Sequence, residues 1–326
     1  MMDAPYPWQQ AHWERLQAAR HQGRLAHAYL LNGPVGVGKR DFAEALAQSF
    51  LCRVPESGGR GCRTCPDCRQ VAAGSHPEFT RVVPDADSKS GEIRIDAIRD
   101  LLDGVALTIL PGRLRVLILD PADRLNRAAA NALLKTLEEP IPGVLWLLIA
   151  TRMGGLPATV KSRCQRLSFT LPPQPLAQAW LATHLSDPSD LAAAGRWLAL
   201  AGGAPLRALS LRDSDWPEQQ VRCLEEFREV LAGHRDPVRV AERWKDLDLG
   251  RLTDGLCYWL ADALKGTIQA AVDATLGEPA RYRRLWLGLM EVRAARDAPL
   301  NTPLLLEAWL IRCARQTPEN FGAELI

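Results

Sequence analysis

Residues 33–39 read Gly-Pro-Val-Gly-Val-Gly-Lys, a glycine-rich loop of the kind that binds phosphate groups. An apolar run at 29–31 precedes it and a helical pattern of apolar residues follows, which predicts a strand, a loop and a helix in succession. Glycines let backbone N–H groups curl around phosphate oxygens, and the lysine would reach the β- and γ-phosphates of ATP or ADP. The residues expected to bind nucleotide here are Gly33, Gly36, Gly38 and Lys39.

Arg40 follows the loop lysine, at the position where this motif has a Ser or Thr whose hydroxyl holds Mg²⁺. The sequence therefore predicts a pocket that binds a nucleotide weakly and lacks one ligand needed to hydrolyse it. The alternative is a phosphate loop that has lost its nucleotide and now only shapes the fold. The substitution at Arg40 leaves both interpretations open.

Asp120 is a second candidate for the same site, because it ends the apolar run 114–120. In phosphate-loop proteins a carboxylate at such a strand end helps to hold Mg²⁺. The next residue, Pro121, has no side chain that could polarise an attacking water. Alternatively, Asp120 is a strand-end carboxylate satisfied by nearby N–H groups. Asp123 is expected to be a charge partner for a helix N-terminus.

Thr151 follows another apolar run, 144–150, and is placed to sense a γ-phosphate. Runs of strand character alternate with helical patterns as far as residue 172, which predicts a parallel sheet covered by helices on both faces. Ligands of such sheets bind at the carboxyl ends of the strands. The phosphate loop, Asp120 and Thr151 all follow strands, so we expect them to contribute to one site.

Four cysteines lie within residues 52–68, hereafter the cysteine loop, and the last three have CxxCxxC spacing. Glycine and proline make this stretch a loop, and four thiolates in that spacing are typical of a tetrahedral structural Zn²⁺ site with no open position for catalysis. A redox CxxC is the alternative, and His76 is the only other nearby candidate ligand. The predicted ligands are Cys52, Cys62, Cys65 and Cys68.

The bulk composition is that of a globular protein. The chain has 326 residues, 47% of them apolar, and a net charge of +2, so no global basic field attracts nucleic acid. The longest apolar run is far shorter than the ~20 residues that a membrane span needs. The first residues lack the features of a signal peptide, which predicts a cytoplasmic location where cysteines stay reduced.

Strand signals stop after residue 172, and the rest of the sequence is helical in pattern. The run 167–171 is expected to be the last strand, and Trp216-Pro217 to mark a linker. We therefore predict three parts, at residues 1–172, 173–213 and 214–326, the first α/β and the others all-α.

The segments that carry a family resemblance are NRAAANALLKTLEEP at 126–140, LLIAT at 147–151, Ser162-Arg163-Cys164, and NTPLLLEAWLIRCA at 301–314. Together with the cysteine loop they resemble the AAA+ clamp-loader subunits of bacterial DNA polymerase III over nearly the whole chain. The resemblance implies an AAA+ phosphate-loop domain with a zinc-binding loop, a helical lid and a helical collar for oligomerisation.

ATPase members of this family keep the Ser or Thr after the loop lysine and an Asp-Glu pair at the acidic strand end. This chain has Arg40 and Asp120-Pro121, so it is similar to the family's non-hydrolysing member. The resemblance then implies that Arg163 is an arginine finger, which acts on the nucleotide of a neighbouring subunit. It also implies that Arg207 is the lid arginine that touches a γ-phosphate.

The implied partners are the gamma/tau and delta subunits in a five-membered ring, the sliding clamp, and primed DNA through the assembled complex, without a membrane. Two alternatives remain. Lys39 and the loop glycines would also suit an active ATPase motor of the same loader. Arginines in the cysteine loop would suit a zinc-dependent DNA-binding module, although Glu56 and Asp67 weaken that charge. Without the resemblance, Arg163 would be taken for a surface ion-pair partner.

Overall fold

The computed structural model describes residues 5–85, 91–105, 114–185, 191–212, 216–264, 279–295 and 302–315. The chain divides into two compact units, residues 1–177 and 178–326. The first unit ends close to the predicted boundary at residue 172. The further division of the second unit into lid and collar stays a prediction.

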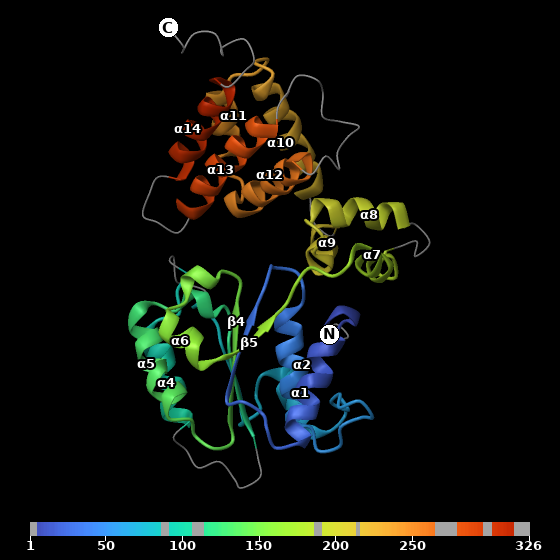
Figure 1. Ribbon diagram of the computed structural model, residues 1–326, viewed down its shortest axis with the longest axis vertical. Helices are drawn as coiled ribbons and strands as arrows, with labels where there is room; N and C mark the ends of the chain where they lie inside the picture. The colour runs from blue at the N-terminus through green and yellow to red at the C-terminus, as the bar shows by residue number, and fades with distance from the viewer. Residues whose placement is uncertain are drawn as a thin grey trace. The chain divides into compact units, whose positions relative to one another are not determined.

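Five parallel strands form the sheet of the first unit, in the order β2-β3-β4-β1-β5. Every residue of β3 and β4 is buried, because helices cover both faces of the sheet (Figure 1). The predicted parallel sheet is thus confirmed. The strands are β1 (Ala28–Asn32), β2 (Phe79–Val82), β3 (Arg115–Leu119), β4 (Val144–Ala150) and β5 (Gln165–Ser168).

Successive side chains of β4 point to opposite faces of the sheet and enter two separate cores. Leu145 and Leu147 pack with helices α1 (Gln10–His21), α2 (Lys39–Leu51) and α3 (Pro66–Ala73). Trp146 and Leu148 pack on the other side. That side holds α4 (Ile95–Val105), α5 (Arg127–Glu138), α6 (Ala158–Arg163) and the short 3-10 helix η2 (Ala122–Arg124), whereas η1 (Pro7–Gln9) precedes α1 and η3 (Met153–Gly155) precedes α6.

The register brings the carboxyl ends of the three central strands to one edge of the sheet. Asn32 of β1 pairs with Ala150 of β4, and Leu119 of β3 pairs with Leu148. The phosphate loop, Asp120 and Thr151 therefore emerge at the same edge, as the sequence predicts.

Two predicted boundaries are wrong. The last strand is Gln165–Ser168, not 167–171, because its partner β1 ends at Asn32, and residues 170 and 171 lie beyond that partner. Trp216-Pro217 is not a linker but the start of helix α10 (Trp216–Leu231), where proline in the first turn costs no hydrogen bond.

The second unit is helical in its described ranges. Helix α7 (Gln174–Ala182) crosses the unit boundary, and seven helices follow it in these ranges. They are α8 (Leu191–Leu200), α9 (Pro205–Arg212), α10, α11 (Pro237–Trp244), α12 (Leu249–Leu264), α13 (Pro279–Ala295) and α14 (Thr302–Arg315). Within the described part of the chain, every helix is too short or too polar to span a lipid bilayer.

Candidate functional site

The phosphate loop adopts a conformation that requires glycine. Gly36 and Gly38 have φ values of +81° and +83°, in the left-handed region that other residues rarely enter. A Cβ added to Gly38 would also lie 2.4 Å from the ring of Tyr6, which packs against the loop. Helix α2 begins at the next residue, Lys39, so the first N–H groups of the helix open onto the loop.

Carbonyl oxygens of the loop are engaged by side chains. Lys39 Nζ donates to the carbonyl oxygens of Gly33 and Pro34, at 2.7 Å each. Gln9 Nε2 donates to the carbonyl oxygens of Val37 and the following glycine, at 2.9 Å each. These carbonyl oxygens of the loop are therefore bound by Lys39, at the start of α2, and by Gln9, in the N-terminal segment.

Several backbone N–H groups of the phosphate loop, unlike these carbonyl oxygens, are unpaired in the described part of the chain. Among the residues that the structure describes, nothing accepts a hydrogen bond from the backbone N–H of Gly36, Gly38 or Lys39. Consecutive unpaired N–H groups in such a curved segment form a concave site for an anion. The loop geometry thus suits a phosphate group.

Lys39 is only 7% exposed. Burial lowers the pKa of its ammonium to about 8, although the carboxylates of Asp120 and Asp123 act in the opposite direction. A negatively charged ligand beside the ammonium would favour its protonated form.

Arg40 is paired with Asp120. Its Nε donates to Asp120 Oδ2, across 80 positions of the sequence. The Asp120 side chain is 7% exposed, whereas that of Arg40 is 56% exposed. In the described part of the chain, the partner of the Asp120 carboxylate is the guanidinium of Arg40 rather than backbone N–H groups, so an oxygen that would bind Mg²⁺ is already engaged. The residues at this edge therefore do not suit Mg²⁺.

Asp123 organises the loop that follows β4. Its carboxylate accepts hydrogen bonds from the backbone N–H groups of Thr151 and Arg152, at 3.1 and 3.2 Å. Asp123 lies in the first turn of the short 3-10 helix η2, as the sequence predicts, and its carboxylate also serves the backbone after β4. No sequence pattern indicates this contact, because it depends on the neighbouring positions of β3 and β4 in the sheet.

The cysteine loop brings its four thiols together. The four sulfur atoms lie within 4.8 Å of one another, with Cys52 and Cys65 Sγ 3.9 Å apart and Cys62 and Cys68 Sγ 4.0 Å apart. Sulfur atoms around a tetrahedral zinc ion are separated by about 3.8 Å, given Zn–S bonds of about 2.3 Å. These residues therefore suit Zn²⁺, as predicted, and in that role the ion would link the ends of the loop.

Hydrogen bonds favour the thiolate form of Cys62 and Cys65, whereas burial raises the pKa of Cys52 and Cys68. The backbone N–H groups of Cys62, Cys65 and Cys68 donate to the sulfurs of Cys52, Cys62 and Cys65, at 3.3, 3.3 and 3.4 Å. Hydrogen bonds from the Thr64 side chain and nearby N–H groups lower the pKa of Cys62 to about 6. His76 is not a further ligand, because its Nε2 lies 3.5 Å from Asp67 Oδ1.

Helices α1 and α2 anchor the cysteine loop. Trp13 Nε1 donates to the carbonyl oxygen of Gly58 at 2.9 Å, and Gln17 Nε2 donates to that of Gly59 at 3.2 Å. Gln48 Nε2 donates to the carbonyl oxygen of Cys68 at 3.2 Å. The loop is thus part of the first unit's packing, not a separate flexible module.

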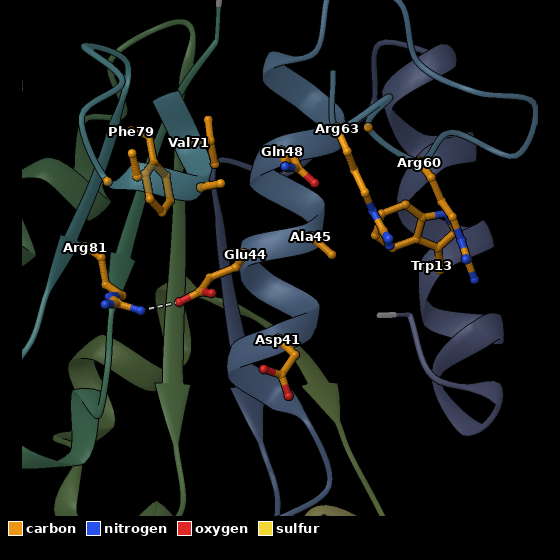
Figure 2. A pocket seen from close by; sticks show the side chains of 14 residues that line it. Trp13, Asp41, Glu44, Ala45, Gln48, Arg60, Arg63, Val71, Phe79 and Arg81 are labelled. Carbon is orange, nitrogen blue, oxygen red and sulfur yellow. Dashed lines mark hydrogen bonds and ion pairs between the residues drawn. The ribbon is translucent and has the colours of Figure 1, made fainter. Parts of the chain in front are cut away.

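A cavity of about 300 Å³ lies along α2 next to the cysteine loop. Figure 2 shows Glu44 and Gln48 of α2 on one side and Arg60 and Arg63 of the cysteine loop on the other. The lining residues carry charges of both signs, and Glu44 of α2 forms an ion pair with Arg81 of β2 (Figure 2). The phosphate loop does not line this cavity, so it is a separate feature from the site at the sheet edge.

Arg163 ends helix α6, and one residue, Cys164, separates it from β5, the outermost strand on one side of the sheet. Its Nη2 lies 2.7 Å from Glu138 Oε1, and its Nη1 donates to the carbonyl oxygen of Thr159 at 3.0 Å. The side chain is 34% exposed. The guanidinium is therefore partly exposed beside the outer strand β5. Its present partners, a carboxylate and a carbonyl oxygen, could be exchanged for a phosphate group.

Arg207 lies in the second unit, in α9. Its Nη1 is 2.9 Å from Asp254 Oδ2 of α12, and Asp254 Oδ1 is 2.7 Å from Arg293 Nη2 of α13. The carboxylate thus joins three helices. The predicted contact of Arg207 with a nucleotide stays a prediction, and its observed contact is structural.

We expect Asp254→Asn to destabilise the second unit by about 1–3 kcal/mol, because Arg207, which is 11% exposed, loses its charged partner. Urea unfolding should show a lower midpoint with an unchanged slope. Asp248→Asn is the matched control, since its pair with Arg251 is half exposed at 4.0 Å and should matter by less than about 0.5 kcal/mol. Equal effects of the two substitutions would contradict the role of Asp254.

A family model described as "DNA polymerase III, delta subunit" matches residues 8–173. A DNA polymerase III subunit delta' from Pseudomonas aeruginosa is 36% identical over 327 residues, covering 95% of this chain and 97% of that protein. The chain belongs to the DNA polymerase III delta' family. The resemblance expected from the sequence is thereby confirmed.

Similarity of this delta' family member to other subunits is less extensive. A DNA polymerase III subunit tau from Salmonella typhimurium is 37% identical, but the match covers 59% of this chain and only 29% of that protein. A crystal structure of a DNA polymerase III gamma subunit-related protein from Thermotoga maritima aligns with 17% identity and a TM-score of 0.46, covering 92% of this chain and 98% of that one.

Proposed function

We propose that this delta' family member is a non-hydrolysing subunit of the bacterial DNA polymerase III clamp loader. It helps to load the sliding clamp onto primed DNA during replication, while neighbouring subunits hydrolyse the ATP. In this proposal it joins gamma/tau and delta subunits in a five-membered ring, and it meets the clamp and primed DNA within that assembly.

The observation that carries the proposal is the pairing of Arg40 with Asp120. Hydrolysis in phosphate-loop proteins relies on a hydroxyl and a carboxylate that hold Mg²⁺ and on a group that positions water. Here an arginine replaces the hydroxyl and also occupies the carboxylate, and Pro121 offers no base. The chain thus lacks three contributions to the reaction while it keeps the loop and Lys39.

Arg163 supplies the proposed activity in trans. Its guanidinium is accessible at the edge of the sheet, and arginine fingers stabilise the charge that develops on a transferring phosphoryl group in a neighbouring subunit. The pair with Glu138 is consistent with this role, because partly exposed pairs are worth only ~0.2–1 kcal/mol and are readily exchanged for a phosphate.

Ion pairs among helices of the second unit support the proposal that the subunit acts as a stator. Asp254 connects α9 of the predicted lid to α12 and α13 of the predicted collar. A lid tied to the collar in this way resists the opening and closing that accompany nucleotide turnover in hydrolysing subunits.

The test of non-hydrolysis is phosphate release by the purified chain alone with ATP and Mg²⁺. We expect no release above that of a Lys39→Ala variant prepared in parallel, because the variant controls for contaminating ATPases. Sustained phosphate release that the Lys39→Ala substitution abolishes would instead identify an active ATPase motor. The DNA-binding alternative has little support, since Arg53 of the cysteine loop is paired with Asp67.

A further inference from the structure

The phosphate loop combines features that non-hydrolysis alone does not explain. If the loop only shaped the fold, its N–H groups could be paired internally like most buried backbone groups. Instead, the N–H groups of Gly36, Gly38 and Lys39 have no acceptor among the described residues, while the neighbouring carbonyl oxygens do have donors. This polarity is that of an anion site.

Arg40 places a cationic side chain where a phosphate-loop protein ordinarily binds Mg²⁺. A nucleotide in a phosphate loop is ordinarily neutralised by the loop lysine and by Mg²⁺, which the strand-end carboxylate holds. In this chain the Arg40 guanidinium contacts that carboxylate, Asp120. Arg40 is the second residue of α2, so its positive charge lies beside the N-terminus of the helix and adjacent to the loop.

We propose that the phosphate loop binds a nucleoside di- or triphosphate without Mg²⁺, with Arg40 taking the place of the metal ion. The N–H groups of the loop and Lys39 hold the phosphates, and the Nη groups of Arg40 donate to phosphate oxygens while its Nε remains on Asp120. Mg²⁺ gains no ligand from the protein, because Asp120 remains paired with Arg40. Mg²⁺ bound to the free nucleotide instead competes with Lys39 and Arg40 for the phosphate oxygens.

Contacts of the N-terminal segment hold the phosphate loop in one conformation, as expected of a preformed binding site. Tyr6 packs against Gly38 and its hydroxyl lies 3.0 Å from Asp41 Oδ2 at the start of α2, and Gln9 binds two carbonyl oxygens of the loop. These contacts fix the loop from the outside without using its N–H groups. A preorganised loop loses less conformational freedom when it binds an anion.

The test is calorimetric titration of the full chain with ATP and with ADP, once in Mg²⁺ and once in EDTA. We expect dissociation constants that agree within about threefold, or tighter binding in EDTA. Arg40→Ser restores a hydroxyl and frees Asp120, so binding by this variant should become at least about tenfold tighter in Mg²⁺ than in EDTA. Lys39→Ala should lose binding in both buffers.

Arg69→Ser is the matched control, because Arg69 is an exposed arginine of α3 outside the loop, and it should behave like the unmodified chain. Binding by the unmodified chain that requires Mg²⁺ would overturn the proposal. So would the absence of any binding in either buffer, or an Arg40→Ser variant that remains indifferent to Mg²⁺. None of these results touches the proposed action of Arg163, which is measured by hydrolysis in the assembled loader.

Discussion

Replacing Arg163 with alanine should slow ATP hydrolysis in the reconstituted loader at one neighbouring site by about 10³-fold or more. The reason is that, as a proposed arginine finger, Arg163 would stabilise the charge that develops on the transferring phosphoryl group. Single-turnover hydrolysis by the complete complex is the appropriate measurement, because it resolves one slowed site from the others. Co-elution of all subunits should be unchanged, since the contacts of Arg163 with the described residues of its own chain are exchangeable.

Arg166→Ala is the matched control for that experiment. Arg166 is an exposed arginine in β5, three positions further along the chain, and we expect its loss to leave single-turnover hydrolysis unchanged. An Arg163→Ala loader that hydrolyses ATP at the unmodified rate would rule out the arginine finger.

Loss of the zinc ligands should have the largest effect on stability. We expect the purified protein to carry one zinc per chain, and Cys65→Ser to lose it together with about 4 kcal/mol of stability in the first unit. For a unit of this size that corresponds to a fall in Tm of about 10 °C. The effect is large because Trp13, Gln17 and Gln48 anchor the cysteine loop to α1 and α2. Disorder of the loop would therefore expose part of the core between these helices and the sheet.

Zinc content by mass spectrometry and thermal unfolding measure the two parts of this prediction. Cys164→Ala serves as control, because Cys164 is buried away from the cluster and burial raises its pKa to about 11, so that its thiol stays neutral. The control should keep its zinc. A zinc-free preparation that unfolds at the same temperature as the zinc-loaded one would refute a structural metal site.

Local patterns in the sequence were sufficient to predict the parallel sheet and the elements that carry the site. Continuous apolar runs predicted β3 and β4, and the glycine loop predicted that a helix, α2, follows it. The cysteine cluster could also be predicted, because its four ligands lie within a single loop and their spacing is specific to metal sites. In each of these cases the residues that interact are near one another in the chain.

The ion-pair partner of Arg40 and the backbone contacts of Asp123 could not be predicted from local sequence patterns. Arg40 and Asp120 are separated by 80 positions, and their pairing depends on the strand order, in which only β4 lies between β3 and β1. The contact of Asp123 with the backbone after β4 depends on the same arrangement. The sequence showed that Arg40 replaces a Mg²⁺ ligand, but only the structure showed that it also takes the carboxylate.

Substitution of Lys39 in the assembled loader tests most directly whether this subunit contributes to hydrolysis only in trans. With Lys39→Ala confined to this chain, we expect steady-state ATP hydrolysis to stay within about twofold of the unmodified complex, while Arg163→Ala in the same chain causes the large loss described above. A Lys39→Ala loader that assembles normally and loses as much hydrolysis as the Arg163→Ala loader would contradict this assignment.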